Sequence, residues 1–137
     1  YRSVVSAYYR GCAGAVIVFD VTSKKSFDNV SYWLKQLKEQ NAGRSLAIIL
    51  AANKVDQKEK RLITNDMITH FCQDKELQYL ETSARNHKNT YLLFTQIINN
   101  ILINNMSEIK ENKGIKTIAS PVEMTTSQRN YCPSCMA

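Results

Sequence analysis

The stretch LAIILAANKVD, Leu46–Asp56, decides both the fold and the candidate site of this chain. Its first part, Leu46–Leu50, is a short apolar run of the kind found in buried strands of parallel sheets. The second part, Ala51–Asp56, places an amide, an ammonium and a carboxylate directly after that run. Open α/β sheets bind ligands at the carboxyl ends of their strands, so we expect a binding site here.

The spacing of these polar groups suits guanine. The carboxylate of Asp56 can accept two hydrogen bonds from the N1–H and 2-amino edge of guanine, whereas adenine presents an acceptor and no amino group there. Asn53 can bond the N7 edge or brace the loop, and the stem of Lys54 can lie along the plane of the base. The pattern Asn-Lys-x-Asp therefore predicts a purine site with a preference for guanine.

A second element, Glu81–Ala84, follows another short strand. From that position Ser83-Ala84 could bring a backbone N–H group to the O6 atom of guanine. Lys54 and Asp56 alone could be ordinary loop charges that follow a strand. The two elements together, in this order and each at the end of a strand, favour a guanine pocket.

Apolar runs and helical periodicity alternate along the chain, which predicts right-handed crossovers and a parallel α/β sheet. The expected strands are Ala15–Phe19, Leu46–Leu50 and Gln78–Leu80. The expected helices are Ser3–Arg10, Phe27–Gln40, Thr64–Gln73 and Thr90–Ile103.

The spacing of apolar residues predicts which face each helix buries. The expected inward faces are Phe27, Val30, Leu34 and Leu37; then Ile68, Phe71 and Cys72; and finally Phe94, Ile97, Ile98 and Ile101. Beyond Asn105 the periodicity fades into polar residues with Pro121 and Pro133. We therefore expect a domain over residues 1–105 and a flexible tail over 106–137.

The chain also resembles a known family, from residue 1 to about residue 105. With the two guanine elements in place, it is similar to the Ras superfamily of small GTPases and, within it, to the Rab branch. The segments that carry the Rab-like resemblance are Tyr1–Ser3, Tyr8–Gly11, Ala15–Thr22, Ser26–Phe27 and Trp33–Leu34.

The resemblance implies a P-loop NTPase-type parallel sheet that is truncated at its amino terminus, with three strands and flanking helices remaining. It implies GTP or GDP as the ligand, with Mg²⁺ in the full-length protein only. The expected partners are Rab effectors, exchange factors and the prenylation and escort machinery. The residues that match the base-binding motifs of the family are Asn53, Lys54, Asp56, Ser83, Ala84 and Arg85, where Arg85 replaces the usual lysine.

The phosphate-binding part of the family pattern is missing. The four glycines of the chain cannot form a G-x-x-x-x-G-K loop followed by Ser or Thr. An Asp-x-x-Gly-Gln segment, which would hold magnesium and orient the attacking water, is also missing. We therefore expect no catalytic residue and no metal ligand in this chain, with ~65 residues of the family's domain lying upstream.

Two functions remain open at this stage. One is a vesicle-trafficking GTPase that hydrolyses GTP in its full-length form. The other is a non-catalytic, truncated fragment that binds partners through Tyr8, Tyr9 and the tail. Asp20, at the end of a predicted strand, could be a magnesium ligand, but we expect a carboxylate that braces a helix start or a loop.

The net charge of +6 comes with no run of Lys and Arg, so the sequence gives no indication of nucleic-acid binding. There is no apolar stretch of ~20 residues for a membrane span, and we expect a cytoplasmic protein.

The carboxyl-terminal Cys132 and Cys135 could form half of a zinc site, a redox pair or a pair of lipid acceptors. Lipidation is the preferred interpretation, with Cys135 the favoured acceptor. It departs from the family pattern because two residues separate the cysteines and Cys135 is third from the end. Lipidation would attach the protein to the cytosolic face of endomembranes.

Overall fold

The structure, a computed structural model, describes Tyr9 and residues 11–113, with 107–113 described by their backbone alone. Its strands are β1 (Gly14–Asp20), β2 (Ala47–Asn53) and β3 (Gln78–Glu81). Its helices are α2 (Lys24–Asp28), α3 (Val30–Gln40), the 3-10 turn η1 (Lys58–Lys60), α4 (Asn65–Lys75) and α5 (Thr90–Lys113).

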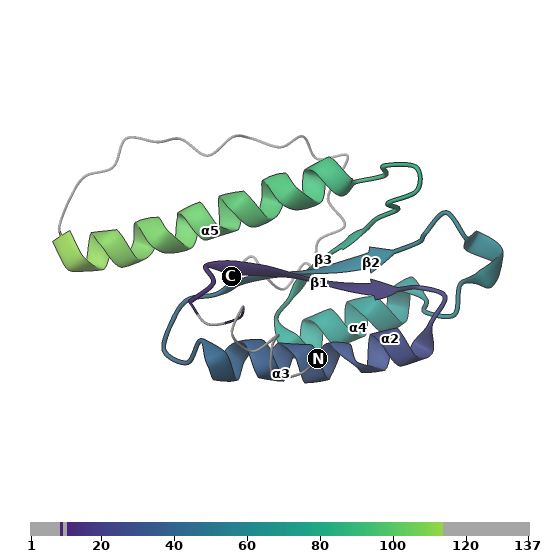
Figure 1. The fold of residues 1–137 in the computed structure, drawn as a ribbon, viewed down its shortest axis with the longest axis horizontal. Helices are drawn as coiled ribbons and strands as arrows, with labels where there is room; N and C mark the ends of the chain where they lie inside the picture. The colour runs from purple at the N-terminus through teal and green to yellow at the C-terminus, as the bar shows by residue number, and fades with distance from the viewer. Residues whose placement is uncertain (1–8, 10, 114–137) are drawn as a thin grey trace.

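The strands form one parallel sheet in the order β1-β2-β3, with helices on both faces (Figure 1). Helix α5 covers one face, and α2, α3 and α4 lie on the other. The predicted fold class, a P-loop NTPase-type parallel sheet with three strands and flanking helices, is confirmed. Each strand extends one to three residues beyond its predicted carboxyl end, so Asn53 is the last residue of β2.

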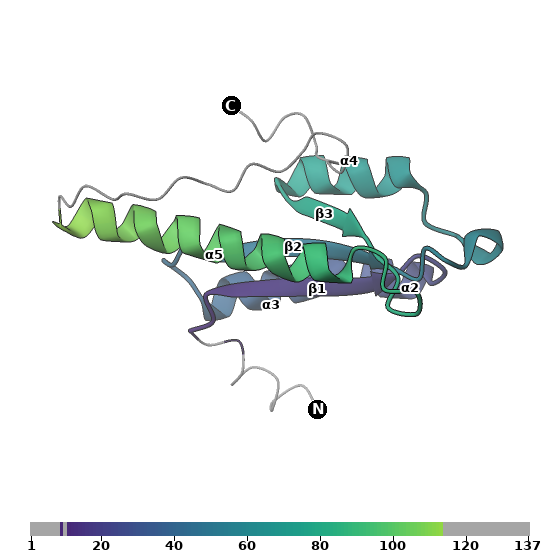
Figure 2. The same cartoon turned by 90° about the horizontal axis from the view of Figure 1, so that it is seen from above.

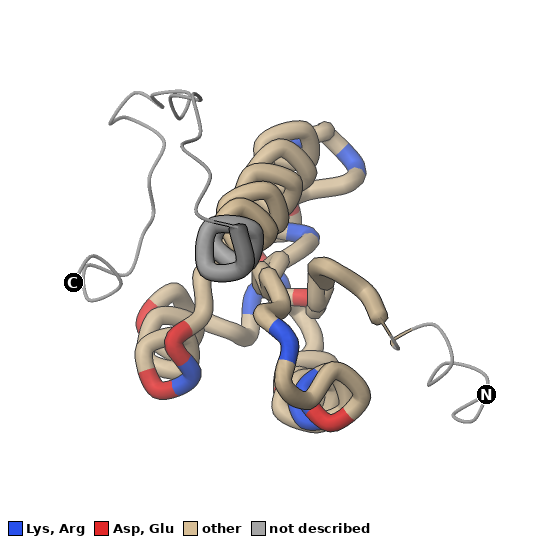
Figure 3. The backbone as a smooth tube through the Cα atoms, turned by 90° about the vertical axis from the view of Figure 1, so that its left-hand side faces the viewer, with Lys and Arg blue, Asp and Glu red and all other residues tan. Residues whose placement is uncertain are grey.

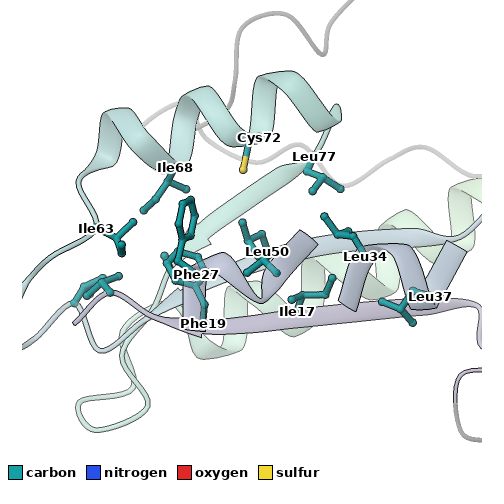
Figure 4. Packing of buried hydrophobic residues seen from close by; sticks show 14 residues of the cluster. Ile17, Phe19, Phe27, Leu34, Leu37, Leu50, Ile63, Ile68, Cys72 and Leu77 are labelled. Carbon is teal, nitrogen blue, oxygen red and sulfur yellow. The ribbon is translucent and has the colours of Figure 1, made fainter. Parts of the chain in front are cut away.

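The larger core lies between the sheet and helices α2, α3 and α4, and Figure 4 shows its packing. Phe27 packs between two other aromatic residues in this core. Its ring centroid lies 5.0 Å from that of Phe19 and 5.3 Å from that of Phe71. Tilted aromatic pairs at this separation stabilise beyond the area that they bury. The inward faces predicted for these helices are confirmed; the members are Phe27, Val30, Leu34, Leu37, Ile68 and Cys72, with Phe71 packed against them.

The prediction of a single helix over Phe27–Gln40 is wrong in two respects. The helical segment begins at Lys24, and it is divided at Asn29. The hydroxyl of Ser23 accepts a hydrogen bond from Ser26 N and caps α2. The N–H of Asn29 donates back to Lys25 O and Phe27 O, which closes this short helix before α3 starts. Both helices still direct their apolar residues into the same core.

Helix α5 runs along β1 and β2 on the opposite face of the sheet (Figure 2). Gly14 permits the close approach, because a Cβ atom there would lie 2.6 Å from Ile101 Cδ1. Leu93 and Ile97 are buried against the sheet, and Ile101 packs beside them.

The predicted inward face of this helix was partly wrong, since Phe94 is 60% exposed and Ile98 is 55% exposed. The helix is apolar on more than one side, so the sequence pattern did not fix which stripe meets the sheet. The sheet takes the stripe of Leu93, Ile97 and Ile101. Thr90–Met106 contains no Lys, Arg, Asp or Glu, and Figure 3 shows this part of the tube without charged residues.

Strand β1 has a paired neighbour, β2, on one side only among the described residues. Val18 lies on this strand and is 58% exposed. Helix α5 ends at Lys113, ten residues beyond the predicted Ile103. Apart from Tyr9, the helix expected at Ser3–Arg10 lies outside the described residues. The part of the predicted tail, 106–137, that follows Lys113 also lies outside them.

Candidate functional site

The carboxyl ends of the three strands bring the candidate residues together. The register pairs Asp20 with Asn53 and Ala52 with Glu81, so the loops that follow the strands start side by side. Backbone hydrogen bonds join the second and third loops directly, since Thr82 N donates to Ala52 O and Val55 N to Thr82 O. The two sequence elements predicted to share a site are therefore neighbours in space.

Asp56 is oriented by Ser83. The hydroxyl of Ser83 donates to Asp56 Oδ1 over 2.6 Å, and the Ser83 residue is fully buried. Among the described residues, no hydrogen bond reaches Asp56 Oδ2. Each carboxylate oxygen has about two acceptor positions. The carboxylate thus retains capacity for the two donors of a guanine edge.

Asn53 braces the loop after β3. Its Oδ1 atom accepts the backbone N–H of Ala84 at 3.1 Å and faces the Thr82 hydroxyl at 3.5 Å. Two roles were predicted for Asn53, bonding the N7 edge of the base or bracing the loop. The structure shows the bracing contact. The Ala84 N–H, expected to reach guanine O6, is held by Asn53 in this structure.

Lys54 has a backbone φ of +67°, which places it in the left-handed region. Its ammonium forms an ion pair with Asp20, with 2.6 Å between Lys54 Nζ and Asp20 Oδ2. The other oxygen of Asp20 accepts the backbone N–H of Thr22 at 2.8 Å and its hydroxyl at 2.7 Å. The prediction that Asp20 braces a loop is therefore confirmed.

Burial alone would raise the pKa of Asp20, but the hydrogen bonds from Lys54 and Thr22 outweigh it and hold this pKa below its ordinary value. The carboxylate is therefore ionised throughout the neutral range. The bonds that it accepts contribute stability at neutral pH, and this contribution is lost as the pH falls through the lowered pKa.

A partly buried ion pair lies next to the site, at the end of β3. Arg61 Nη1 lies 2.7 Å from Glu81 Oε1, and their side chains are 23% and 13% exposed. Arg61 also donates through Nε to Ile63 O at 2.7 Å, which ties the segment after η1 to the end of β3. Asn89 closes the third loop by donating to Glu81 O at 2.8 Å.

An open hollow of about 520 Å³ borders these residues and is lined by Asp56, Gln57, Lys58, Glu59, Lys60 and Arg85. It is within the range of ligand sites in proteins. It shares Asp56 and the exposed Arg85 with the candidate residues, while Asn53, Lys54, Ser83 and Ala84 lie outside its lining. The hollow therefore adjoins the predicted base site and does not coincide with it.

Similarity to known proteins shows the family of this chain. The Ras family model matches residues 1–103. The chain belongs to the Ras family. It is similar to Ras-related protein YPTC6 of Chlamydomonas reinhardtii, at 40% identity over 101 residues, and to GTP-binding protein ypt3 of Schizosaccharomyces pombe, at the same identity and length. It is also similar to Ras-related protein RABA4a of Arabidopsis thaliana, at 34% identity over 146 residues.

These relatives mark the chain as a Rab-type member of the Ras family. The alignments to YPTC6 and ypt3 cover 74% of this chain and 46% and 47% of the relatives. The alignment to RABA4a covers 96% of this chain and 64% of the relative. The chain thus spans about half to two thirds of the length of these relatives.

Two kinds of element are absent from the described part of this Ras-family chain. Among the described residues, no three His, Cys, Asp or Glu side chains gather as a metal site requires. None of the described helices combines the length and the apolar character needed to cross a bilayer. Cys132 and Cys135 lie outside the described residues.

Sequence reasoning did not find the contact between Asp20 and Lys54. The sequence did contain a signal for it. Asp20 stands at the end of one predicted strand and Lys54 just after the next, and adjacent parallel strands would bring such residues together. The strand order was needed to make that step. Arg61 was missed too, because nothing in its local pattern points to Glu81.

We predict that Asn53→Ala speeds hydrogen exchange at the Ala84 amide. A hydrogen bond of this kind contributes about 1 kcal/mol net, which corresponds to about fivefold in the exchange rate. Amide exchange of residues 1–137, followed by NMR, measures the effect. The matched control is Asn86→Ala, which removes the acceptor of Lys88 N in the same loop and should leave Ala84 unchanged. An unchanged Ala84 rate in Asn53→Ala would show that Asn53 does not hold this amide in solution.

Proposed function

We propose that this chain supplies the guanine-recognition part of a Rab-type GTPase of vesicle trafficking. The observation that carries the proposal is the pair of side-chain contacts that joins its two motifs, Ser83 to Asp56 at 2.6 Å and Asn53 to Ala84 at 3.1 Å. The contacts arrange a carboxylate and an amide side by side at the end of the sheet. Hydrolysis of GTP belongs to the full-length protein in this proposal.

Asp56 would read the Watson–Crick edge of the base. Its carboxylate accepts the N1–H and the 2-amino group, while Ser83 keeps it turned toward them. The stem of Lys54 lies along one face of the base, and Arg85 approaches from the loop after β3. Ala84 N–H turns from Asn53 to the O6 atom, and the amide of Asn53 then faces N7. Part of the binding energy is consequently an exchange of one hydrogen bond for another.

We predict that Asp56→Asn shifts preference from guanine to xanthine nucleotides. The new amide brings a donor to the 2-amino group of guanine, which leaves buried groups unpaired at a cost of about 1–3 kcal/mol each. Xanthine has an oxygen at that position and accepts the donor. Competition of GTP with XTP measures the preference in a chimera that places the amino-terminal portion of a Rab relative ahead of Tyr1.

Asp66→Asn is a matched control, because Asp66 lies in the first turn of α4. It makes the same chemical change outside the site and should leave the preference for GTP intact. An Asp56→Asn variant that still prefers GTP would remove Asp56 from the base pocket.

For residues 1–137 alone we predict weak GTP binding and no hydrolysis. About three hydrogen bonds to the base contribute on the order of 3–6 kcal/mol gross. Association costs an estimated ~4–15 kcal/mol, so affinity would be millimolar or weaker. Phosphate and magnesium contacts, which stabilise the transferring phosphoryl group in GTPases, have no sequence counterpart here. Calorimetry and a phosphate-release assay measure both quantities. Sub-micromolar binding or turnover would contradict the prediction.

A non-catalytic interaction fragment is the second candidate. It would bind partners through Tyr8, Tyr9 and the tail, and the exposed apolar residues of α5 add a surface suited to contacts. Phosphate release by the chimera, with none from an Asp56→Ala version at the same GTP concentration, would decide for the GTPase. The Rab-type relatives favour the first candidate and suggest regulatory partners. We propose that these partners include Rab effectors, exchange factors and prenylation and escort proteins.

We also propose that Cys135 and Cys132 carry lipid groups that hold the protein on the cytosolic face of endomembranes. Two anchors are physically sensible, because one chain gives only marginal and reversible binding. The tail carries no polybasic run that could act as a second signal. Both cysteines lie beyond the last described residue, so the proposal rests on the sequence and the family.

We predict that replacing Cys132 and Cys135 together by Ser releases the protein from membranes and leaves nucleotide binding intact. Cell fractionation measures the first effect, and mass spectrometry of the unsubstituted protein detects the lipid. The control is Cys12→Ser, which also removes a thiol but lies near the start of β1. Unmodified thiols at both tail cysteines, in cells with working prenyltransferases, would exclude lipidation, and bound zinc would support the metal alternative.

A further inference from the structure

The ion pair between Asp20 and Lys54 lies at the end of the sheet where the base is proposed to bind. Lys54 Nζ is 2.6 Å from Asp20 Oδ2, and the side chains are 49% and 22% exposed. The two residues come from different strand ends, because β1 stops at Asp20 and Lys54 follows the last residue of β2. The contact therefore spans two loops of the site.

Asp20 is itself held firmly. Its other carboxylate oxygen, Oδ1, accepts hydrogen bonds from the N–H and the hydroxyl of Thr22. Its backbone N–H donates to Ser26 Oγ at 3.0 Å, and its backbone oxygen accepts from Ser26 Oγ at 3.1 Å and from Ser23 N at 3.0 Å. Ser23 and Ser26 thus fix the backbone of Asp20, and Thr22 fixes the carboxylate that meets the Lys54 ammonium.

We propose that Asp20 is a positioning residue for the guanine site, which holds the Lys54 ammonium so that the lysine stem is set along the base plane before ligand binds. The inference rests on the proposed function. A lysine side chain loses much rotamer freedom when it is ordered, and a stem ordered in advance removes that cost from binding. Asp20 thereby acts on the face of the base, whereas Asp56 acts on its edge.

This division of roles gives a distinctive expectation. Hypoxanthine differs from guanine only by the missing 2-amino group, which the stem of Lys54 does not contact. Asp20→Asn should therefore weaken the binding of GMP and the binding of IMP by the same factor, about fivefold. Any variant that acts through the Asp56 edge would weaken the two nucleotides unequally.

The experiment is NMR on isotope-labelled residues 1–137, in two parts. In the first, ¹³C relaxation of the Lys54 side chain is measured without ligand, where Asp20→Asn should lower the order of the stem. In the second, GMP and IMP are titrated into a chimera that places the amino-terminal portion of a Rab relative ahead of the labelled residues, while the amides of Asn53 and Ala84 are followed. Asp28→Asn is the matched control, since it makes the same change on the exposed pair of Lys24 and Asp28, 3.1 Å apart.

A double-mutant cycle separates positioning from general damage to the fold. Lys54→Met keeps the stem and removes the ammonium, so it should weaken binding about as much as Asp20→Asn, and the two together should weaken it no further. Additive losses would overturn the inference, because they show that Asp20 acts without Lys54.

The remaining outcomes also discriminate. Equal order of the Lys54 stem in the parent chain and in Asp20→Asn would overturn the inference, as would unequal losses for GMP and IMP. If the parent chimera binds GMP and its Asp20→Asn version binds it equally well, only this inference fails. If the parent chimera gives no shift at Asn53 or Ala84 with either nucleotide, the proposed function fails and the inference with it.

Discussion

The parallel register of the sheet is the constraint on which the rest of the structure depends. Hydrogen bonds along β1-β2-β3 align Asp20 with Asn53 and Ala52 with Glu81, so the strands deliver their last residues to one edge. Both apolar clusters depend on the same ladder, because alternate residues of each strand face the two helical layers. A shift of one residue in β2 would exchange these faces and move Asn53 away from Asp20 and Ala84.

Contacts within the protein order the side chains of the candidate site. Ser83 orients Asp56, Asn53 restrains Ala84, and the pair of Arg61 and Glu81 fixes the end of β3. An ordered site avoids the entropy loss of assembling its groups on binding. In the proposed function the Ala84 N–H would exchange Asn53 for the base, so the lost contact with Asn53 would offset part of the binding energy.

Much of this could be predicted from the sequence, for reasons that are visible in particular residues. The runs Ala15–Phe19 and Leu46–Leu50 are short, apolar and followed by polar loops, so they predicted two strands and the edge of the sheet where the candidate site lies. Helix α5 could not be oriented in the same way, since its uncharged length offers the sheet several equivalent stripes. The break at Asn29 depends on the Ser23 cap, and a helix continuing through both is equally compatible with the periodicity.

The backbone of Lys54 carries one further consequence. A residue with a side chain in the left-handed region at φ +67° strains the chain by about 1 kcal/mol, and glycine would remove that strain. A chain shaped by stability alone would have Gly or Asn at position 54. Glycine at this turn would relieve the backbone but would remove the side chain that pairs with Asp20.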